Sequence, residues 1–153
     1  MNVPQSDNTE VATYLKNYEF AELYIQLPAG WKYENLDDPK LNWPIMQLRW
    51  LGKYPRTNDT WLGAPATVMS RDPVEPLAPD TTFDSLLLLP DKKFQNTSGI
   101  TVQLYRLVPL NPEERQLELK SGLPALMSAL DKINTPMIVD MSRKNAAVKS
   151  SRK

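Results

Sequence analysis

The segment Asn42–Gly63, NWPIMQLRWLGKYPRTNDTWLG, holds three of the four tryptophans of the chain and decides how the rest is interpreted. Asn42 is a good helix N-cap, and Pro44 follows in the first turn, where a missing N–H leaves no hydrogen bond unmade. Apolar side chains continue as far as Tyr54, and Pro55 is expected to end the helix. The segment therefore predicts a helix from about Asn42 to Tyr54.

The apolar side chains of this helix divide into two stripes at about 100° per residue. The first stripe is Ile45, Leu48 and Leu51, and the second is Met46, Trp50 and Tyr54. Gln47 separates the stripes on one side, and Arg49 and Lys53 separate them on the other. A helix that packs on a sheet needs only one apolar stripe. The second stripe is therefore either buried beneath the loops at 31–41 and 71–82, or it binds a partner.

The turn after the helix bears on the same question. Asn58 or Asp59 can hydrogen-bond the backbone two residues further on and fix a turn that directs Trp61. Trp61 is then either an anchor of the hydrophobic core or a neighbour of the second stripe. Tryptophan and tyrosine are enriched among the residues that contribute most to protein–protein binding. The candidate partner-binding residues are Met46, Trp50, Tyr54, Asp59 and Trp61.

Strand and helix patterns alternate along the rest of the chain. Apolar and polar side chains alternate over Phe20–Leu27, which is typical of a half-buried strand. Ser85–Leu89 has four consecutive leucines and predicts a central strand that is covered on both faces. It should pair with Ile100–Val108 in an antiparallel hairpin whose loop is long. Further predicted elements are a short strand at 64–69, helices at 112–120 and 123–133, and a final strand at 137–139.

This order of elements predicts an α+β (mixed α/β) fold, with a mixed, largely antiparallel sheet flanked by helices. At 153 residues the chain should form a single domain. The helix at 112–120 has its own start signal, since Asn111 is an N-cap, Pro112 lies in the first turn and Glu114 can close a capping box.

The composition argues against several classes of function. The chain has no cysteine and no histidine, so it lacks a thiolate nucleophile, the commonest general base and the commonest metal ligand. No signal peptide and no apolar run long enough to span a bilayer is visible, so neither secretion nor a membrane is expected. Together with the missing cysteines, this favours a cytoplasmic protein.

The formal net charge of zero hides an asymmetry. Residues 141–153 hold 5 of the 18 basic side chains and no acid, which leaves 13 basic against 18 acidic, or −5, on the body. An acidic body argues against a nucleic-acid groove on the folded domain. We expect a domain at 1–141 followed by a basic, disordered tail at 142–153.

Carboxylates gather in a proline-rich stretch, at Asp72, Glu75, Asp80 and Asp84. Such oxygens can hold a hard cation, but their spacing matches no calcium loop, and surface loops collect acids for solubility alone. The G-x-S-x-G pattern and phosphate-binding glycine loops are also absent from the sequence. The sequence therefore predicts no catalytic residue, no metal site and no cofactor.

Over almost its whole length, and in one order, the chain resembles the Suppressor of fused domain. The opening segment carries Trp43-Pro44, Leu51-Gly52-Lys53-Tyr54 and Asn58-Asp59-Thr60-Trp61. Matches elsewhere are Ala21-Glu22-Leu23, Leu27-Pro28, Trp31, Leu86–Pro90, Gln103–Pro109, Glu113-Glu114 and Ile138–Arg143. In the family, further strands normally precede the part matched by Met1–Pro28. If such strands are missing here, an open sheet edge invites a homodimer or an added strand.

The resemblance implies a protein-binding module without catalysis. In the animal protein this domain and a second one hold a transcription-factor peptide as an added strand, and Tyr54 matches a tyrosine that contacts the peptide. The acid and histidine that help to hold it fall at Ala64–Ala66 here, so an animal-type clamp is not expected.

Small bacterial members are associated with polymorphic toxin systems, which favours an immunity protein that neutralises a toxin domain. The alternatives are a regulatory adaptor that binds another cytoplasmic protein or a transcription factor, and, in a different class, an enzyme of unknown reaction.

Overall fold

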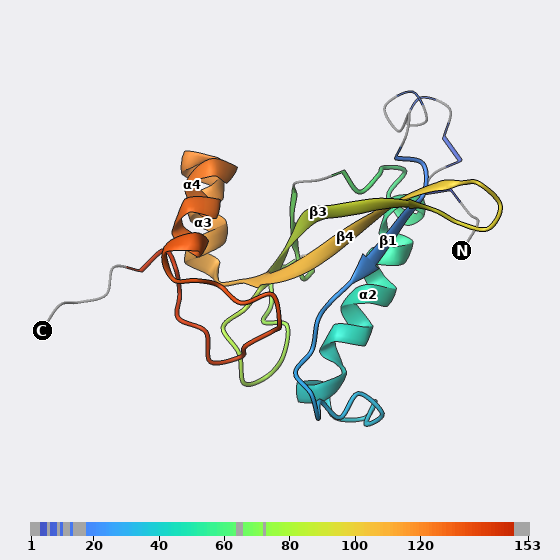
Figure 1. Cartoon of the computed structure of the whole chain (residues 1–153). Helices are drawn as coiled ribbons and strands as arrows, with labels where there is room; N and C mark the ends of the chain where they lie inside the picture. The colour runs from blue at the N-terminus through green and yellow to red at the C-terminus, as the bar shows by residue number, and fades with distance from the viewer. Residues whose placement is uncertain are drawn as a thin grey trace, which may run out of the picture.

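Four strands form one mixed sheet in the computed structural model, which describes residues 4–5, 7–8, 10, 13, 18–63, 66–71 and 73–148. They are β1 (Ala21–Tyr24), β2 (Ala66–Met69), β3 (Ser85–Gln95) and β4 (Thr101–Leu110), in the spatial order β1-β4-β3-β2 (Figure 1). β1 runs parallel to β4, and the other pairs are antiparallel. The helices are α2 (Pro39–Thr57), α3 (Pro112–Ser121) and α4 (Leu123–Lys132). The predicted α+β fold with a largely antiparallel sheet is confirmed.

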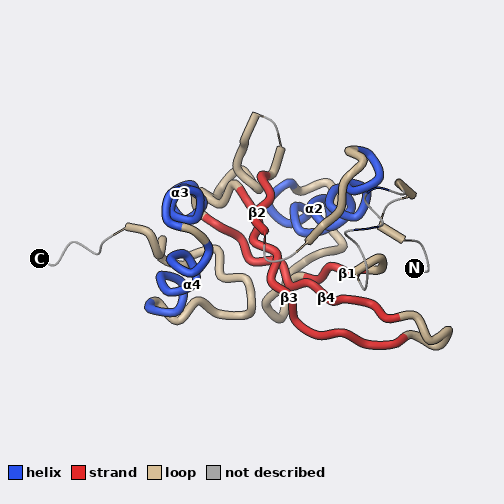
Figure 2. Tube along the Cα trace, turned by 90° about the horizontal axis from the view of Figure 1, so that it is seen from above, coloured by secondary structure: helices blue, strands red, loops and turns tan. Residues whose placement is uncertain are grey.

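The leucines of β3 point to opposite faces of the sheet in turn, as the period of a strand requires. Leu86 and Leu88 join the core between the sheet and α2, which also contains Trp43, Leu51 and Leu107. Leu87 joins a second core on the opposite face, together with Val108, Leu110, Leu126 and Leu130. Figure 2 shows α2 on one side of the strands and α4 on the other. The inner strand that the leucine run predicted is therefore present, with cover on both faces.

The hairpin of β3 and β4 is longer than predicted. Asp91–Gln95, expected as part of a long loop, continues β3, and the register shifts between Pro90 and Lys93. The prediction was wrong because a bulge lets a strand continue past a proline. The turn itself is short: Asn96 Oδ1 accepts hydrogen bonds from the N–H groups of Ser98 and Ile100 at 2.9 and 3.0 Å.

The boundaries predicted for α2 were also wrong. Asp38, not Asn42, is the N-cap: its side chain accepts a hydrogen bond from the Lys40 N–H at 2.9 Å, and Pro39 occupies the first turn. Pro44 is therefore inside the helix, and Pro55 lies in its last turn without ending it. β1 is shorter than the predicted Phe20–Leu27. The strand predicted at 64–69 is seen as Ala66–Met69, and its first two residues lie outside the described part of the chain.

The side of α2 that faces the core lies between the two predicted stripes. Trp43, Gln47 and Leu51 follow one another at i, i+4 and i+8, and all three are buried. Gln47 was expected to separate the stripes, yet it is only 8% exposed and its Oε1 has no hydrogen-bond partner among the described residues. The second stripe therefore lies on one flank of the helix, and Leu48 of the first stripe lies on the other.

Glu114 ties the start of α3 to the C-terminal segment. Its carboxylate is fully buried and accepts the Asn111 N–H at 2.8 Å, which makes the predicted capping-box contact. Two nitrogens of Arg143 donate to the same carboxylate at 2.6 and 2.7 Å, and the Ala146 N–H donates at 2.7 Å. The start of the predicted basic tail is thus bound to α3, and residues 149–153 lie outside the described residues.

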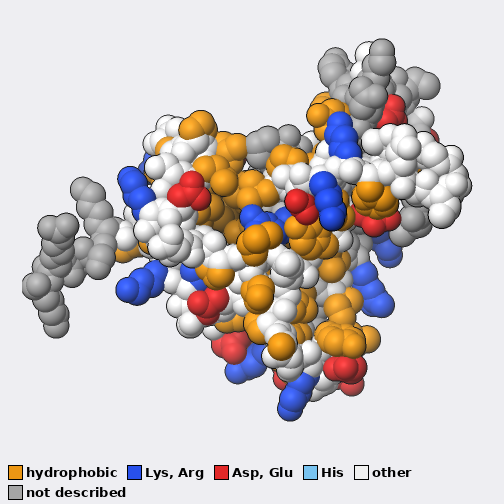
Figure 3. Space-filling view, viewed as in Figure 1, with side chains coloured by type: hydrophobic (Ala, Val, Ile, Leu, Met, Phe, Trp, Pro, Cys, Tyr) orange, Lys and Arg blue, Asp and Glu red, His pale blue; other side chains and the backbone are white. Residues whose placement is uncertain are grey.

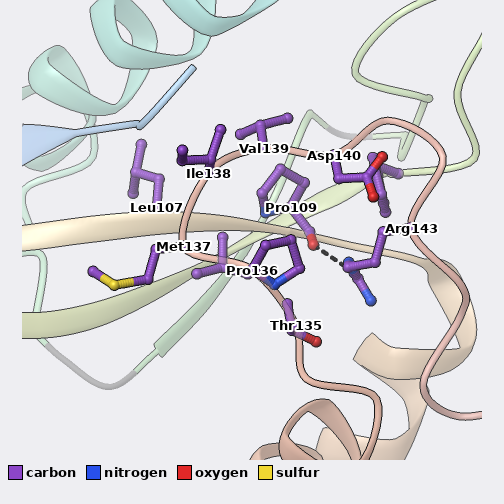
Figure 4. A pocket seen from close by; sticks show the side chains of 11 residues that line it. Leu107, Pro109, Thr135, Pro136, Met137, Ile138, Val139, Asp140 and Arg143 are labelled. Carbon is purple, nitrogen blue, oxygen red and sulfur yellow. Dashed lines mark hydrogen bonds between the residues drawn. The ribbon is translucent and has the colours of Figure 1, made fainter. Parts of the chain in front are cut away.

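The strand predicted at 137–139 is absent, since this described segment forms a bend with no ladder of hydrogen bonds. Its single tie is the Val139 N–H, which donates to the Gln26 carbonyl oxygen at 2.8 Å, while the Val139 side chain enters the core. Figure 4 shows how this segment and Arg143, whose Nη2 donates to the Pro109 carbonyl oxygen at 2.9 Å, enclose a hollow of about 10 Å³. That space holds at most one water molecule, so it is no ligand pocket.

Candidate functional site

The second stripe of α2 is half covered by the rest of the chain. Trp50 and Tyr54 are partly buried and pack against the core that also includes Leu77 and Ala78 of the proline-rich loop. Their rings meet edge to face, with centroids 5.2 Å apart and planes inclined by 61°. Met46, one turn earlier, is 51% exposed. The aromatic pair is therefore partly buried against this core, whereas Met46 beside it is exposed.

The turn after α2 is held by other bonds than those predicted. The Asn58 N–H and the Asn58 side-chain amide both donate to the Tyr54 carbonyl oxygen at 3.0 Å, four residues back in the chain, rather than to the backbone ahead. Asp59 has a φ of 50°, a left-handed conformation that Asp tolerates. Its Oδ2 accepts a hydrogen bond from the Asn8 side chain at 2.6 Å. Asp59 thus joins the turn to the N-terminal lead-in.

Trp61 is not a core anchor. Its residue is 36% exposed and it belongs to neither hydrophobic core. The indole lies over Gly63, where a Cβ atom built on the glycine would meet Trp61 Nε1 at 2.8 Å. Only glycine leaves room for the ring in this position. The structure thus brings Trp50 and Tyr54 into contact, and it leaves Met46, Asp59 and Trp61 exposed without a described contact to that pair.

A second surface feature of α2 was not predicted from the sequence. A groove of about 840 Å³ lies between α2 and β1, on the flank away from the aromatic pair. Leu23, Leu48, Leu51 and Leu62 contribute its apolar lining, and Arg49, Lys53 and Arg56 its charged side. In the sequence, Arg49 and Lys53 mark only a polar spacer between two stripes. Their spacing of four residues, one turn of a helix, was the available signal for a basic surface.

The carboxylates of the proline-rich stretch do not form one site. Glu75 pairs with Arg71 at 2.8 Å, Asp80 with Lys40 at 3.4 Å and Asp84 with Arg115 at 2.9 Å, while Asp72 lies outside the described residues. No group of three or more acids, among the residues that the structure places, is arranged to hold a metal ion. The same residues include no helix that combines the length and apolarity needed to cross a bilayer.

Two tyrosines, Tyr24 at the end of β1 and Tyr105 of β4, have raised pKa values. Burial, with a smaller effect of Tyr18, raises the pKa of Tyr105 to about 12, and its hydroxyl has no hydrogen-bond partner among the described residues. Burial and a hydrogen bond to Asp91 at 2.9 Å raise the pKa of Tyr24. Both phenols thus stay neutral at physiological pH, so neither is set up as a nucleophile or a base.

A sequence model of the family described as Suppressor of fused protein (SUFU) matches residues 1–144. Among solved structures, the chain superposes with a TM-score of 0.55 and 17% identity on a chain of "the Sufu-Fu complex crystal structure". The match covers 69% of this chain and 46% of that one, so the present chain spans less than half the length of that relative. At this identity the superposition shows a shared fold and nothing more. No curated protein matches the sequence.

Proposed function

Because the chain belongs to the Suppressor of fused family, we propose that it is a non-catalytic protein-binding module, and specifically an immunity protein that neutralises a bacterial toxin domain in the cytoplasm. An immunity protein needs only a surface that complements its toxin. The absence of histidine and cysteine from the sequence fits this role better than it fits an enzyme.

The observation that carries the proposal is the half-covered aromatic pair on α2. Trp50 and Tyr54 are held rigidly, since their rings touch each other and their inner sides pack on the core. Rigid aromatic side chains with one open side are the usual anchors of protein interfaces. We propose that the toxin contacts Met46, Trp50 and Tyr54, and that Asp59 and Trp61 extend the contact beyond the helix end.

The experiment is a growth assay. This chain is co-expressed with a toxin domain encoded beside its gene, in cells that the toxin alone kills. An immunity protein restores growth, and Trp50→Ala in the same assay reduces the rescue. Growth that stays blocked while the two proteins also fail to co-purify contradicts the immunity role.

A complex that forms without rescuing growth would instead assign the chain as a regulatory adaptor for another protein. Besides an immunity protein and an adaptor, a homodimer is a further possibility, since an open sheet edge can pair with a second copy. Sedimentation of the chain alone tests it.

A further inference from the structure

The helix α2 is basic, although the body of the protein is acidic. It carries four basic side chains, at Lys40, Arg49, Lys53 and Arg56, and no acid in its 19 residues. Over residues 1–140 the chain as a whole has 13 basic against 18 acidic side chains. Figure 3 shows Lys and Arg side chains beside apolar ones along the border of the molecule over α2. The positive charge of this helix is therefore a local feature, set against the charge of the body.

The two inner charges of α2 are not matched by acids of the described chain. The first and the last of the four basic side chains form ion pairs within the chain, at 3.4 and 2.8 Å. Arg49 and Lys53 are exposed and form no ion pair with any described residue. Like charges four residues apart on a helix repel each other slightly, so this pair does not stabilise the fold. It leaves positive charge available to another molecule.

Both charges adjoin the apolar stripe that includes Met46 and Trp50. Arg49 follows Met46, and Lys53 follows Trp50, at a spacing of three residues, which makes each pair neighbours on the surface of the helix. Met46, Arg49, Gly52 and Lys53 are all exposed, and we call these four residues the outer face of α2. A surface that joins an apolar side chain to two cations is complementary to an apolar surface that carries acids.

Gly52 is a glycine for which the described chain gives no internal reason. A Cβ atom built on it would meet nothing within 4 Å, and its φ is not positive, so an alanine would fit. Glycine inside a helix lowers stability relative to alanine because it loses more conformational freedom on folding. Such a residue is useful where the backbone of another molecule must come close. Gly52 therefore points to a close approach at the outer face.

The approaching element is best a helix. The backbone N–H and carbonyl groups inside α2 are hydrogen-bonded along the helix, so a strand finds no backbone groups to pair with there. Two helices pack with their axes about 8–10 Å apart, and the distance depends on the side chains at the point of contact. A glycine at that point allows the short end of this range.

We propose that the outer face of α2 binds a helix of a partner protein, and that the contacting side of this helix carries acidic side chains. The partner helix crosses α2 over Gly52. Its carboxylates pair with Arg49 and Lys53, and its apolar side chains cover Met46. The proposal rests on the proposed binding function and names the chemistry of the partner at that site.

Other occupants fit this surface less well. Two copies of the chain that packed α2 against α2 would bring Arg49 and Lys53 of each near the same cations of the other, and like charges oppose association. A nucleic acid or an anionic membrane would meet only two available cations on a body that is otherwise acidic, so the body would repel it.

The first test is a selection from a display library of helical peptides, with one side of the helix randomised and the full chain as bait. We expect the selected peptides to be rich in Asp and Glu and to bind more weakly as salt is raised. Arg49→Glu/Lys53→Glu should weaken their binding at least about tenfold. Lys92→Glu/Lys144→Glu, the same charge change at exposed residues outside α2, should leave the affinity unaltered.

Several results of this selection would overturn the proposal. They are a failure to select any peptide, selected peptides without acids, and equal affinity of the acidic peptides for Arg49→Glu/Lys53→Glu. Binding of a DNA duplex or of vesicles with anionic lipid that this variant abolishes would assign the outer face to phosphate groups instead. Self-association of the chain that blocks the peptides would assign it to a second copy.

Gly52→Ala tests the close approach by itself. Alanine favours the helix and its methyl group meets no described atom, so the melting temperature should rise. The same methyl group would hold the partner helix away, so the affinity for the acidic peptides should fall about tenfold. Ser128→Ala, at an exposed position inside α4, is the control and should not change the affinity. A lower melting temperature or an unchanged affinity for Gly52→Ala would refute the crossing over Gly52.

The proposed function and the acidic helix can fail separately. If the toxin domain binds Arg49→Glu/Lys53→Glu and Gly52→Ala as tightly as wild type but binds Trp50→Ala weakly, the acidic helix is refuted and the binding function stands. If no toxin domain binds, while acidic peptides bind wild type and not these variants, the immunity role fails and the outer face remains a binding surface.

Discussion

Two regions of this molecule differ in how completely their side chains find partners within the chain. At the start of α3, a carboxylate and a guanidinium are buried together: Glu114 is 0% exposed, the Arg143 side chain is 6% exposed, and all contacts between them are short. Arg143 also lies 5.1 Å from the centre of the Phe83 ring. On the flank of α2, the rings of Trp50 and Tyr54 are only partly buried, with Met46 beside them at 51% exposure.

This contrast assigns the Glu114–Arg143 pair to folding stability and the aromatic pair on α2 to binding. A buried charge is tolerated only when its partners are complete, so the Glu114–Arg143 pair has no spare group to offer another molecule. A half-open ring keeps apolar area that only a partner can cover. We therefore expect changes at Arg143 to lower the free energy of unfolding, and changes at Trp50 and Tyr54 to lower affinity. Measurements of stability and affinity on the variants below test this assignment.

The largest effect is expected from Arg143→Ala. It leaves the Glu114 carboxylate buried without its counter-charge, which should lower the free energy of unfolding by about 3–5 kcal/mol. Urea denaturation followed by tryptophan fluorescence measures this. Lys144→Ala, an exposed neighbour, should change the value by less than about 0.5 kcal/mol. A loss of the same small size for Arg143→Ala would show that the pair is not a structural tie.

Trp50→Ala should mainly affect binding. Loss of an interface anchor weakens association by about 2 kcal/mol or more, roughly 30-fold in Kd. Calorimetric titration with the toxin domain measures it, beside a thermal melt, and Leu119→Ala on the exposed side of α3 is the control. If Trp50→Ala instead costs about 3–5 kcal/mol of stability and the folded remainder binds normally, the aromatic pair belongs to the core.

Acid should weaken the Glu114 tie. Burial alone would raise the pKa of Glu114, but the hydrogen bonds from Arg143, Ala146 and Asn111 hold it below the ordinary 4.5. A carboxyl with a depressed pKa in the folded state contributes stability that is present above pH 4.5 and is lost as the pH falls through the folded pKa. Each unit of depression corresponds to about 1.4 kcal/mol.

The pH dependence has a built-in control. Without Arg143 the burial of Glu114 dominates and its pKa rises above 4.5. The stability gap between wild type and Arg143→Ala should therefore begin to narrow above pH 4.5, as Glu114 of the variant takes up its proton, and narrow further below pH 4.5, as the wild type loses the stability that its depressed pKa provides. The comparison is made in an Asp140→Asn background, because hydrogen bonds from Ser142 lower the pKa of Asp140 as well. If the difference in free energy of unfolding between wild type and Arg143→Ala stays constant from pH 7 to pH 4, the protonation of Glu114 does not contribute to the effect of Arg143.

Tyr54→Phe should give the smallest effect. It keeps the ring contact with Trp50 and removes only the hydroxyl, so a hydrogen bond to a partner would be lost at a cost of about 1 kcal/mol in binding. The melting temperature should not change. A lower melting temperature with unchanged affinity would place the hydroxyl in an internal bond and remove Tyr54 from the proposed surface.

Much of the fold follows from local patterns. The leucine run predicted an inner strand with two covered faces, and Asn111-Pro112 with Glu114 predicted the start of α3, because both signals lie within a few residues. The start of α2 was misplaced although its signal, Asp38-Pro39, is equally local and stronger than Asn42. The strand expected at 137–139 does not form, because strand propensity depends on context: here the segment bends, and the Val139 N–H and side chain tie it to the body.

The candidate site was only partly open to prediction. Helical spacing placed Met46, Trp50 and Tyr54 on one flank of α2, and the ring contact of Trp50 with Tyr54 agrees with it. The partial burial of Trp50 and Tyr54 could not be predicted, since the core against which they pack is assembled from distant segments of the chain. The same holds for the groove beside β1, which exists only because a strand and a helix from different parts of the chain face each other.

By itself, the sequence determined the α+β class, the central strand, the helix face that carries the candidate residues, and the lack of histidine and cysteine chemistry. These depend on composition and on periods of two or about 3.6 residues, which are local properties of a chain. Only the tertiary structure decided that Arg143 is bound to Glu114, 29 residues away, and that β1 pairs with β4 alone among the described strands. Such pairings depend on which distant segments meet, and no local period encodes that.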